Sequence, residues 1–253
     1  MAVDLKLFKV GTDKAFKVGG SVAGFKFTPK SLSGLKLWLN NDPDTMTLSG
    51  SNKVSQWDDS SGLGNHFTQA VGVNQPEYIP NVVGSLGGVF WQDRTSQRLI
   101  STFSSSIGRS NSIFMVWQQI PTNNVPFFIY DGQPSGTNRN NFLFSSGNLR
   151  VNSGISNAVK SLAVNPIPLV VSEIKNSSTS TASQYYENGV QIGSNFNNGS
   201  NIIQGFTLGN AFVVQSPEQS LNGYIHEFIV VSGDLTTLER TTLNNYLITK
   251  YGL

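Results

Sequence analysis

Short runs of apolar residues alternate with polar turn segments along the chain from residue 31 onward. The runs recur about every 8 to 15 residues, and the segments between them are rich in Asn, Ser and Gly, which is typical of strands in a sandwich or barrel. Asn188-Gly189, between two runs, is the residue pair of a type I′ hairpin turn. The pattern predicts strands at Leu35–Leu39, Gly88–Phe90, Ser112–Gln118, Pro126–Tyr130, Asn141–Ser145, Leu149–Val151, Pro168–Ile174, Gln184–Glu187, Val190–Ile192, Ile202–Leu208 and Gly223–Val231.

One stretch, residues 236–251, has the sequence pattern of a helix. Thr236 and Glu239 have the spacing of a capping box, in which the threonine oxygen accepts a free backbone N–H and the glutamate reaches back to the cap. Leu243, Tyr246, Leu247 and Tyr251 then fall on one helical face, and Gly252 is a stop signal. We expect this helix to close one end of an all-β domain.

The first 30 residues form a basic segment in which aromatic and cationic residues alternate with a period of two. The alternation predicts short extended segments that pair with a sheet edge. Two interpretations follow: an assembly arm that docks on partner proteins or on copies of the same chain, or the first hairpin of the domain's own sheet. We expect an arm over residues 1–30 and one domain over 31–253. The arm's anchoring residues would be Phe8, Lys9, Phe16, Lys17, Phe25 and Phe27.

Composition supports an all-β protein and removes several kinds of chemistry. Only 13% of the 253 residues are charged, about half the usual fraction, and helix bundles rely on charged surfaces. The chain has no cysteine and two histidines, which excludes disulfides and cysteine-ligated zinc. Residues 1–36 carry a net charge of +5 and the rest −3. We see no signal-peptide pattern and no apolar stretch of the ~18 residues that a membrane span needs.

Several stretches, in order, resemble a known family. The segment Ser55–Gln69 (SQWDDSSGLGNHFTQ) is similar to a W-x-D-x-S-G-x-G-N-x-x-x-Q loop, and Gln75–Tyr78 to an R-P-x-Y turn. The chain's close, Leu221–Val230 followed by Tyr246–Gly252, is similar to a G-x-I-x-E-x-x-x-Y strand and an N-Y-L-x-x-K-Y-G helix. With Leu35–Leu39 and Tyr185–Val190, this set resembles concanavalin A-like lectin/glucanase domains of the laminin-G-like kind, which recur in phage virion and bacterial surface proteins.

The resemblance implies an all-β fold, a two-sheet antiparallel jelly-roll sandwich with a C-terminal helix, and leaves the activity open. A glucanase of this fold needs paired carboxylates, usually as E-x-D-x-x-E, and the sequence has no such spacing. The resemblance implies instead that Glu227 is structural. No serine stands in a G-x-S-x-G elbow, and no glycine-rich segment precedes a helix. We therefore expect a protein that is not an enzyme and has no nucleic-acid partner.

Oxygen ligands gather in one short loop, where Asp58, Asp59 and Asn65 stand among glycines. Carboxylate and amide oxygens are the ligands that Ca²⁺ takes. Aspartate, asparagine and glycine are also what a tight turn uses. The loop is therefore either a structural turn or a calcium site, and no other cofactor is expected.

A sugar site needs an exposed aromatic face beside amide and carboxylate groups. In Gly88–Arg94 the alternation places Phe90 inward and Trp91 outward, next to Gln92, Asp93 and Arg94. The alternative is that a neighbouring loop covers Trp91. A second candidate combines Tyr130 and Asp131 with the cluster at residues 138–141.

These observations favour a non-enzymatic phage virion module, either a capsid decoration or a tail- or fibre-associated protein. Its arm would bind other virion proteins or copies of itself, and its lectin-like domain would bind host surface polysaccharide. It would be located in the virion, assembled from the host cytoplasm, or otherwise at the extracellular surface. The alternative is a carbohydrate-binding module or glycoside-hydrolase-related domain of a bacterial surface or secreted protein.

Overall fold

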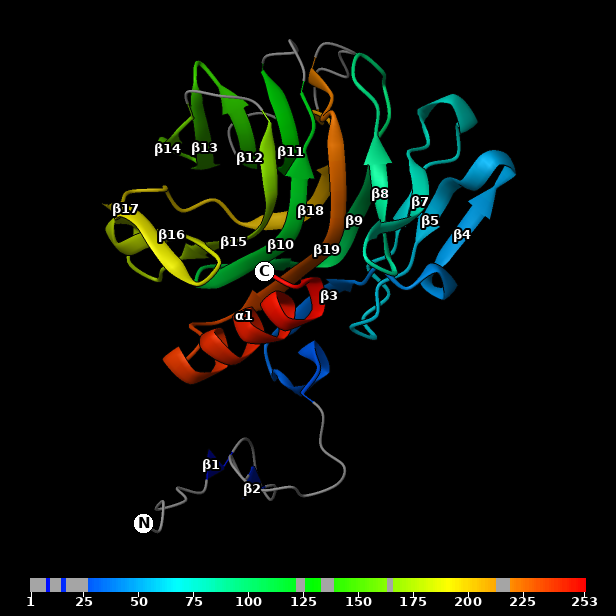
Figure 1. Cartoon of the computed structure of the whole chain (residues 1–253). Helices are drawn as coiled ribbons and strands as arrows, with labels where there is room; N and C mark the ends of the chain where they lie inside the picture. Colours follow the sequence, from blue (N-terminus) through cyan, green and yellow to red (C-terminus); the bar gives the residue numbers. More distant parts are fainter. Residues whose placement is uncertain are drawn as a thin grey trace.

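The computed structural model describes residues 8–9, 15–16, 27–121, 126–132, 139–162, 166–212 and 219–253. The fold is all-β with one α-helix, α1 (Thr237–Tyr251), as the sequence predicts (Figure 1). The main sheet contains β3 (Leu35–Leu39), β4 (Met46–Ser49), β5 (Lys53–Trp57), β6 (Phe67–Thr68), β7 (Glu77–Val83), β8 (Leu86–Trp91), β9 (Leu99–Ile107), β10 (Asn111–Gln119), β11 (Phe127–Gly132), β12 (Asn140–Ser145), β13 (Asn148–Ser153), β14 (Ser156–Ser161), β15 (Ile167–Asn176), β16 (Ser183–Glu187), β17 (Val190–Phe196), β18 (Ile203–Leu208) and β19 (Gly223–Ser232).

The strands of the main sheet pair antiparallel in one long series that curls back on itself. From one free edge to the other the order is β14-β13-β12-β11-β18-β9-β6-β5-β7-β8-β19-β10-β15-β16-β17, with β4 paired to β5 and β3 to β19. The two edge strands approach each other, since the Asn157 side chain on β14 donates to the Asn197 carbonyl just after β17. The sheet is therefore nearly closed into a barrel.

The enclosed core is built from aromatic rings of opposite walls. Trp117 on β10 meets Phe142 on β12 edge-to-face with ring centroids 5.7 Å apart. Tyr130 on β11 meets Phe228 on β19 in the same way at 5.6 Å. Neither pair belongs to hydrogen-bonded neighbours, so these contacts join the walls, and edge-to-face packing adds to the burial of their large apolar area.

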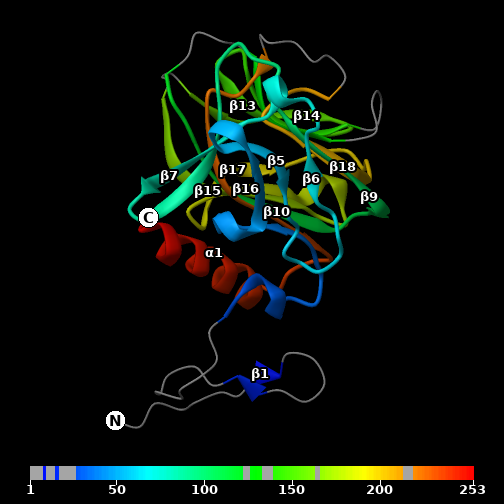
Figure 2. The same ribbon diagram turned by 90° about the vertical axis from the view of Figure 1, so that its right-hand side faces the viewer.

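A second apolar layer lies between the barrel and α1, which crosses its outer surface (Figure 2). On β10, Ile113, Met115 and Trp117 face the barrel core while Phe114 and Val116 face α1. Because both faces are covered, this strand is buried at nearly every position. The helix contributes Leu243, Leu247 and Tyr251 to the layer.

The predicted ends of α1 are confirmed. The Thr236 hydroxyl accepts the Glu239 N–H at 3.2 Å, and the Glu239 carboxylate accepts the Thr236 N–H at 2.9 Å. Gly252 ends the helix with φ of 69°, a left-handed conformation that glycine adopts without strain. The Asn188-Gly189 turn also has positive φ at both residues, 47° and 80°, as a type I′ turn requires.

Every predicted strand is present, and β4, β5, β6, β7, β9 and β14 were not predicted. In the basic segment, β1 (Phe8–Lys9) and β2 (Ala15–Phe16) pair antiparallel, with Phe8 opposite Phe16. Lys17 and Phe25 lie outside the described residues. Phe27 packs its ring against Tyr246 of α1 at a centroid distance of 5.8 Å, so this residue contacts the domain.

Replacement of Leu247 by alanine tests the docking of α1. Leu247 is fully buried, whereas Leu238 in the same helix is 43% exposed. We expect Leu247→Ala to lower the free energy of unfolding by about 2–5 kcal/mol, and Leu238→Ala to change it by less than about 0.5 kcal/mol. Urea unfolding of the two variants measures this. Equal losses would contradict the packing of α1 on the barrel.

Candidate functional site

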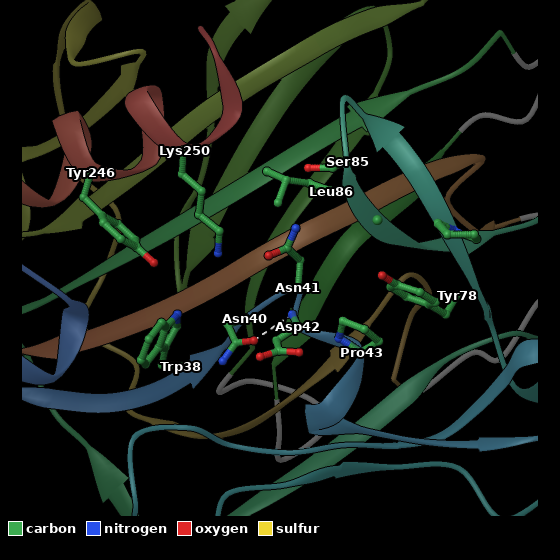
Figure 3. Close-up of a pocket in the computed structure, with 12 residues that line it drawn as sticks. Trp38, Asn40, Asn41, Asp42, Pro43, Tyr78, Ser85, Leu86, Tyr246 and Lys250 are labelled. Carbon is green, nitrogen blue, oxygen red and sulfur yellow. Dashed lines mark hydrogen bonds between the residues drawn. The ribbon is translucent and has the colours of Figure 1, made fainter.

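A pocket of about 640 Å³ opens on the outer surface beside the C-terminal half of α1. Three segments line it (Figure 3): the end of β3 with the turn that follows, the β7–β8 hairpin, and α1. The lining residues are Trp38, Asn40, Asn41, Asp42, Pro43, Tyr78, Pro80, Ser85, Leu86, Gly87, Tyr246 and Lys250.

The turn after β3 is held in place by the loop that resembles the family motif. The Trp57 indole N–H donates to the Asn40 carbonyl at 2.7 Å, and the Asn40 amide donates to the Ser60 hydroxyl at 2.8 Å. The Asn40 side-chain oxygen accepts the Asp42 N–H at 2.8 Å, an Asx turn. With Asn40 tied on both sides, the next two residues lie along the pocket wall.

Glycine at position 87 allows the opposite wall to form. A Cβ on Gly87 would lie 2.2 Å from the Tyr78 hydroxyl oxygen, so only glycine lets the tyrosine ring lie across β8. Burial and the nearby Asp42 carboxylate raise the pKa of Tyr78. Its phenol therefore stays protonated and can donate a hydrogen bond.

A buried carboxylate on β19 joins β3 and α1 beneath the pocket. In β19 a bulge puts Val116 opposite Glu227 and Trp117 opposite Ile225, so that the extra residue turns Glu227 towards α1. Glu227 is fully buried. It accepts from the Trp38 indole at 2.7 Å, from Lys250 at 2.6 Å and from the Tyr251 hydroxyl at 2.9 Å. This confirms the structural role expected for the residue, with side-chain donors from both β3 and α1.

One buried polar atom at the pocket has no partner within the described part of the chain. Asn41 is 5% exposed, and its amide nitrogen is buried without a hydrogen bond. Tyr78 and Tyr246 approach from opposite sides with their hydroxyls directed inwards, and the Asn41 amide lies between them (Figure 3). Tyr78 is only 8% exposed, so it offers its hydroxyl, and the half-buried Tyr246 offers a ring. Such an arrangement can hold a small polyhydroxylated ligand against one ring and hydrogen-bond its hydroxyls.

The predicted outward orientation of Trp91 is wrong. Its side chain is fully buried in the barrel core, and a Cβ on Gly209 would lie 2.1 Å from its indole nitrogen. Phe90 is the residue that faces outward, where it packs on Tyr224 with centroids 5.0 Å apart. A ligand cannot stack on Trp91 in this structure.

The other predicted ligand residues do not line the pocket. Gln92 and Arg94 are exposed and Asp93 is half-buried in the turn after β8, where the Gln97 side chain accepts the Gln92 N–H at 2.8 Å. Tyr130 is a core residue. Asp131 is fully buried, and its carboxylate accepts from Arg139 and from the Phe212 N–H. Tyr130 and Asp131 therefore have structural roles.

In the candidate calcium loop, the Asp59 carboxylate is already used by protein donors. It accepts from the backbone N–H groups of Trp38, Ser61 and Asn65 at 2.8–3.0 Å and from the Ser61 hydroxyl at 2.7 Å. Asp58 contacts His66 at 2.9 Å. Within the described residues, no group of three acidic or histidine side chains could hold a metal. This geometry favours the structural turn.

Sequence reasoning missed the pocket although its residues left a signal. Asn40, Asn41 and Asp42 follow the first strand directly, and Tyr246 and Lys250 belong to the terminal helix motif. Taken alone, the first group is typical of a turn after a strand, and the second of the surface of a helix. Only the pairing of β3 with β19, under α1, brings the two groups together.

No protein-family model matches the chain, and no curated protein sequence matches it. Solved structures share its fold. A Trypanosoma rangeli sialidase in complex with sialic acid matches with a TM-score of 0.59 and 12% identity, over 86% of this chain and 33% of the sialidase. The ligand-binding domain of botulinum neurotoxin serotype D, in complex with N-acetylneuraminic acid, matches with a TM-score of 0.58 and 14% identity, over 86% of this chain and 51% of that one.

A third solved structure is matched over nearly its whole length. Domain 4 of AbnA, an extracellular GH43 arabinanase of Geobacillus stearothermophilus in complex with arabinotriose, has a TM-score of 0.55 and 15% identity, over 83% of this chain and 98% of the domain. The chain thus spans about a third of the sialidase and half of the toxin domain.

Among the described residues, no helix has the length and apolarity to cross a membrane.

The buried His226 beneath the pocket predicts a loss of stability in acid. Burial and the nearby Lys250 lower its pKa to about 4, although its hydrogen bond to the Gly87 carbonyl opposes this. The unfolded chain, with an ordinary histidine pKa of about 6.5, therefore binds more protons than the folded chain between those values. Folding should lose up to about 3 kcal/mol as the pH falls from 6.5 to 4.

Denaturant unfolding at several pH values, compared between the wild type and His226→Gln, isolates this slope. Glu173, whose pKa burial raises to about 7 despite its contact with Arg240, contributes an opposite slope that both proteins share. NMR titration of the His226 ring in the wild type gives the midpoint directly. A midpoint near 6.5, or equal slopes in both proteins, would contradict the prediction.

Proposed function

We propose that the protein is a non-catalytic glycan-binding module whose sugar site is the pocket beside α1. The observation that carries the proposal is the buried, unpaired amide nitrogen of Asn41 between the rings of Tyr78 and Tyr246. We classify the nearly closed sheet as the jelly-roll sandwich of concanavalin A-like domains.

The chemistry of the pocket matches what sugars require. A pyranose or furanose has an apolar C–H face that packs on aromatic rings, and hydroxyls that need amide, hydroxyl or carboxylate partners. Tyr246 supplies the accessible ring, and Asn41, Asp42, Ser85 and the hydroxyl of the largely buried Tyr78 supply the polar groups. The arabinotriose in the structure of AbnA domain 4, which shares the fold over 98% of its length, gives independent support.

Ion pairing of the buried carboxylates supports a role without catalysis. Glu227 pairs with Lys250, Glu173 with Arg240 and Asp131 with Arg139. Glycoside hydrolysis uses two facing carboxyl groups in most families, and among the lining residues Asp42 is the one acid. The pocket therefore binds without cleaving.

The finer proposal is that the module belongs to a phage virion, assembled from the host cytoplasm, where it adheres to host surface polysaccharide. It rests on the basic, aromatic sequence of the first 30 residues and on the resemblance described above. The alternative, a carbohydrate-binding module of a bacterial surface or secreted protein, uses the same pocket.

Glycan-array binding of the wild type and pocket variants tests the sugar site. Tyr246→Ala removes one ring and should weaken binding by about 1–3 kcal/mol, roughly 5- to 150-fold. Thr249→Ala, exposed on the same helix and outside the pocket, is the matched control and should bind as the wild type does. Unchanged binding by Tyr246→Ala, with an intact fold by circular dichroism, would refute the site.

Deletion of residues 1–26 tests the assembly arm. The deletion stops before Phe27 because that ring packs on Tyr246. We expect a folded domain with unchanged glycan binding that no longer attaches to its particle or self-associates, measured by co-sedimentation and light scattering. Normal attachment of the truncated chain would remove the case for an arm, and so would its failure to fold.

A further inference from the structure

We infer that the pocket selects uncharged sugars and disfavours acidic ones such as sialic acids and uronates. The inference rests on the proposed glycan-binding function and names its ligand class. The ligand preference inferred here differs from that of the sialidase and the toxin domain with the same fold, whose structures contain sialic acid.

Among the described residues, Lys250 is the one cation that lines the pocket, and its charge is already neutralised. The Lys250 ammonium lies 2.6 Å from the Glu227 carboxylate, which is fully buried beneath it. The ammonium has three N–H donors, so a ligand can share it with Glu227, but moving it away would leave a buried charge with one fewer partner, which is strongly unfavourable. Lys250 therefore adds no uncompensated positive charge to the pocket.

The remaining charge at the pocket is negative. Asp42 is exposed on the rim, and one of its oxygens accepts the Asp44 N–H at 3.1 Å. Asp44 follows two residues later and is also exposed. With Glu227 below and Asp42 at the rim against Lys250 alone, the lining and its floor carry a net charge of −1.

The neighbouring tyrosines respond to this field. Burial is the larger cause of the raised pKa of Tyr78 and Tyr246, and the charges of Asp42 and Glu227, respectively, add to it. Both phenols remain donors, as does the unpaired Asn41 amide. Donors beside a single carboxylate suit sugar hydroxyls, which both donate and accept. A ligand carboxylate would gain those donors but would meet Asp42, with no uncompensated cation among the described lining residues.

Matched glycans separate the two classes. We would titrate the full chain with asialo and sialylated forms of the same N-linked glycan, and with neutral galactan and its sulfated form. We expect the acidic member of each pair to bind at least about tenfold more weakly at low salt, with the difference shrinking as salt screens the repulsion.

Two charge variants locate the cause. Asp42→Asn keeps an acceptor for the Asp44 N–H and should reduce the neutral-to-acidic ratio several-fold. Asp234→Asn removes the same charge from an exposed position before the other end of α1 and should leave the ratio unchanged. An unchanged ratio in Asp42→Asn would overturn the inference.

Two further outcomes are distinguishable. If acidic glycans bind equally or more tightly and Tyr246→Ala abolishes that binding, the inference is wrong and the glycan-binding function stands. If neither class of glycan binds through the pocket, both fail.

Discussion

The hydrogen-bonded carboxylate of Glu227 is the interaction on which the rest of the structure depends. An unpaired charge at this depth would cost several kcal/mol, and three donors from two different elements offset that cost: the Trp38 indole on β3, and Lys250 and Tyr251 on α1. The requirement fixes how β3 and the helix sit on β19. The bulge at His226 makes these contacts possible, because it turns the side chains of His226 and Glu227 to the same face of β19, away from the barrel core.

The same constraint builds the pocket. Because Lys250 and Tyr251 are held at Glu227, the last turns of α1 are placed next to the residues that follow Trp38. The motif loop fixes these residues from the other side, since Trp57 and Ser60 both bind Asn40. A site bounded by a helix, a tied turn and a hairpin is preorganised, and preorganisation lowers the entropic cost of binding a small ligand. The same ion pair balances the positive charge of Lys250.

Much of the fold follows from local patterns, because period-two runs and a capping box are encoded in neighbouring residues. The strands that escaped prediction have polar exposed faces. In β9, Leu99, Phe103 and Ile107 face inward, but serines and threonine fill most of the positions between them. At Trp91 the predicted alternation of inward and outward side chains is correct, but the inward and outward positions are exchanged. Phe90 and Trp91 are both large and aromatic, and the glycines before them do not indicate which of the two faces the core. The orientation is set by Gly209, on a distant strand end, which makes room for the indole.

The pocket was beyond local reasoning because its walls come from segments about 200 residues apart. Its decisive feature, an amide left unpaired at Asn41, depends on what every neighbour does. A crystal structure of the protein with an oligosaccharide chosen by array binding tests the account most directly. It should show a sugar ring packed on Tyr246 in the pocket, with a hydroxyl hydrogen-bonded to the Asn41 amide nitrogen. An ordered sugar on another surface, with the pocket free of it, would contradict the account.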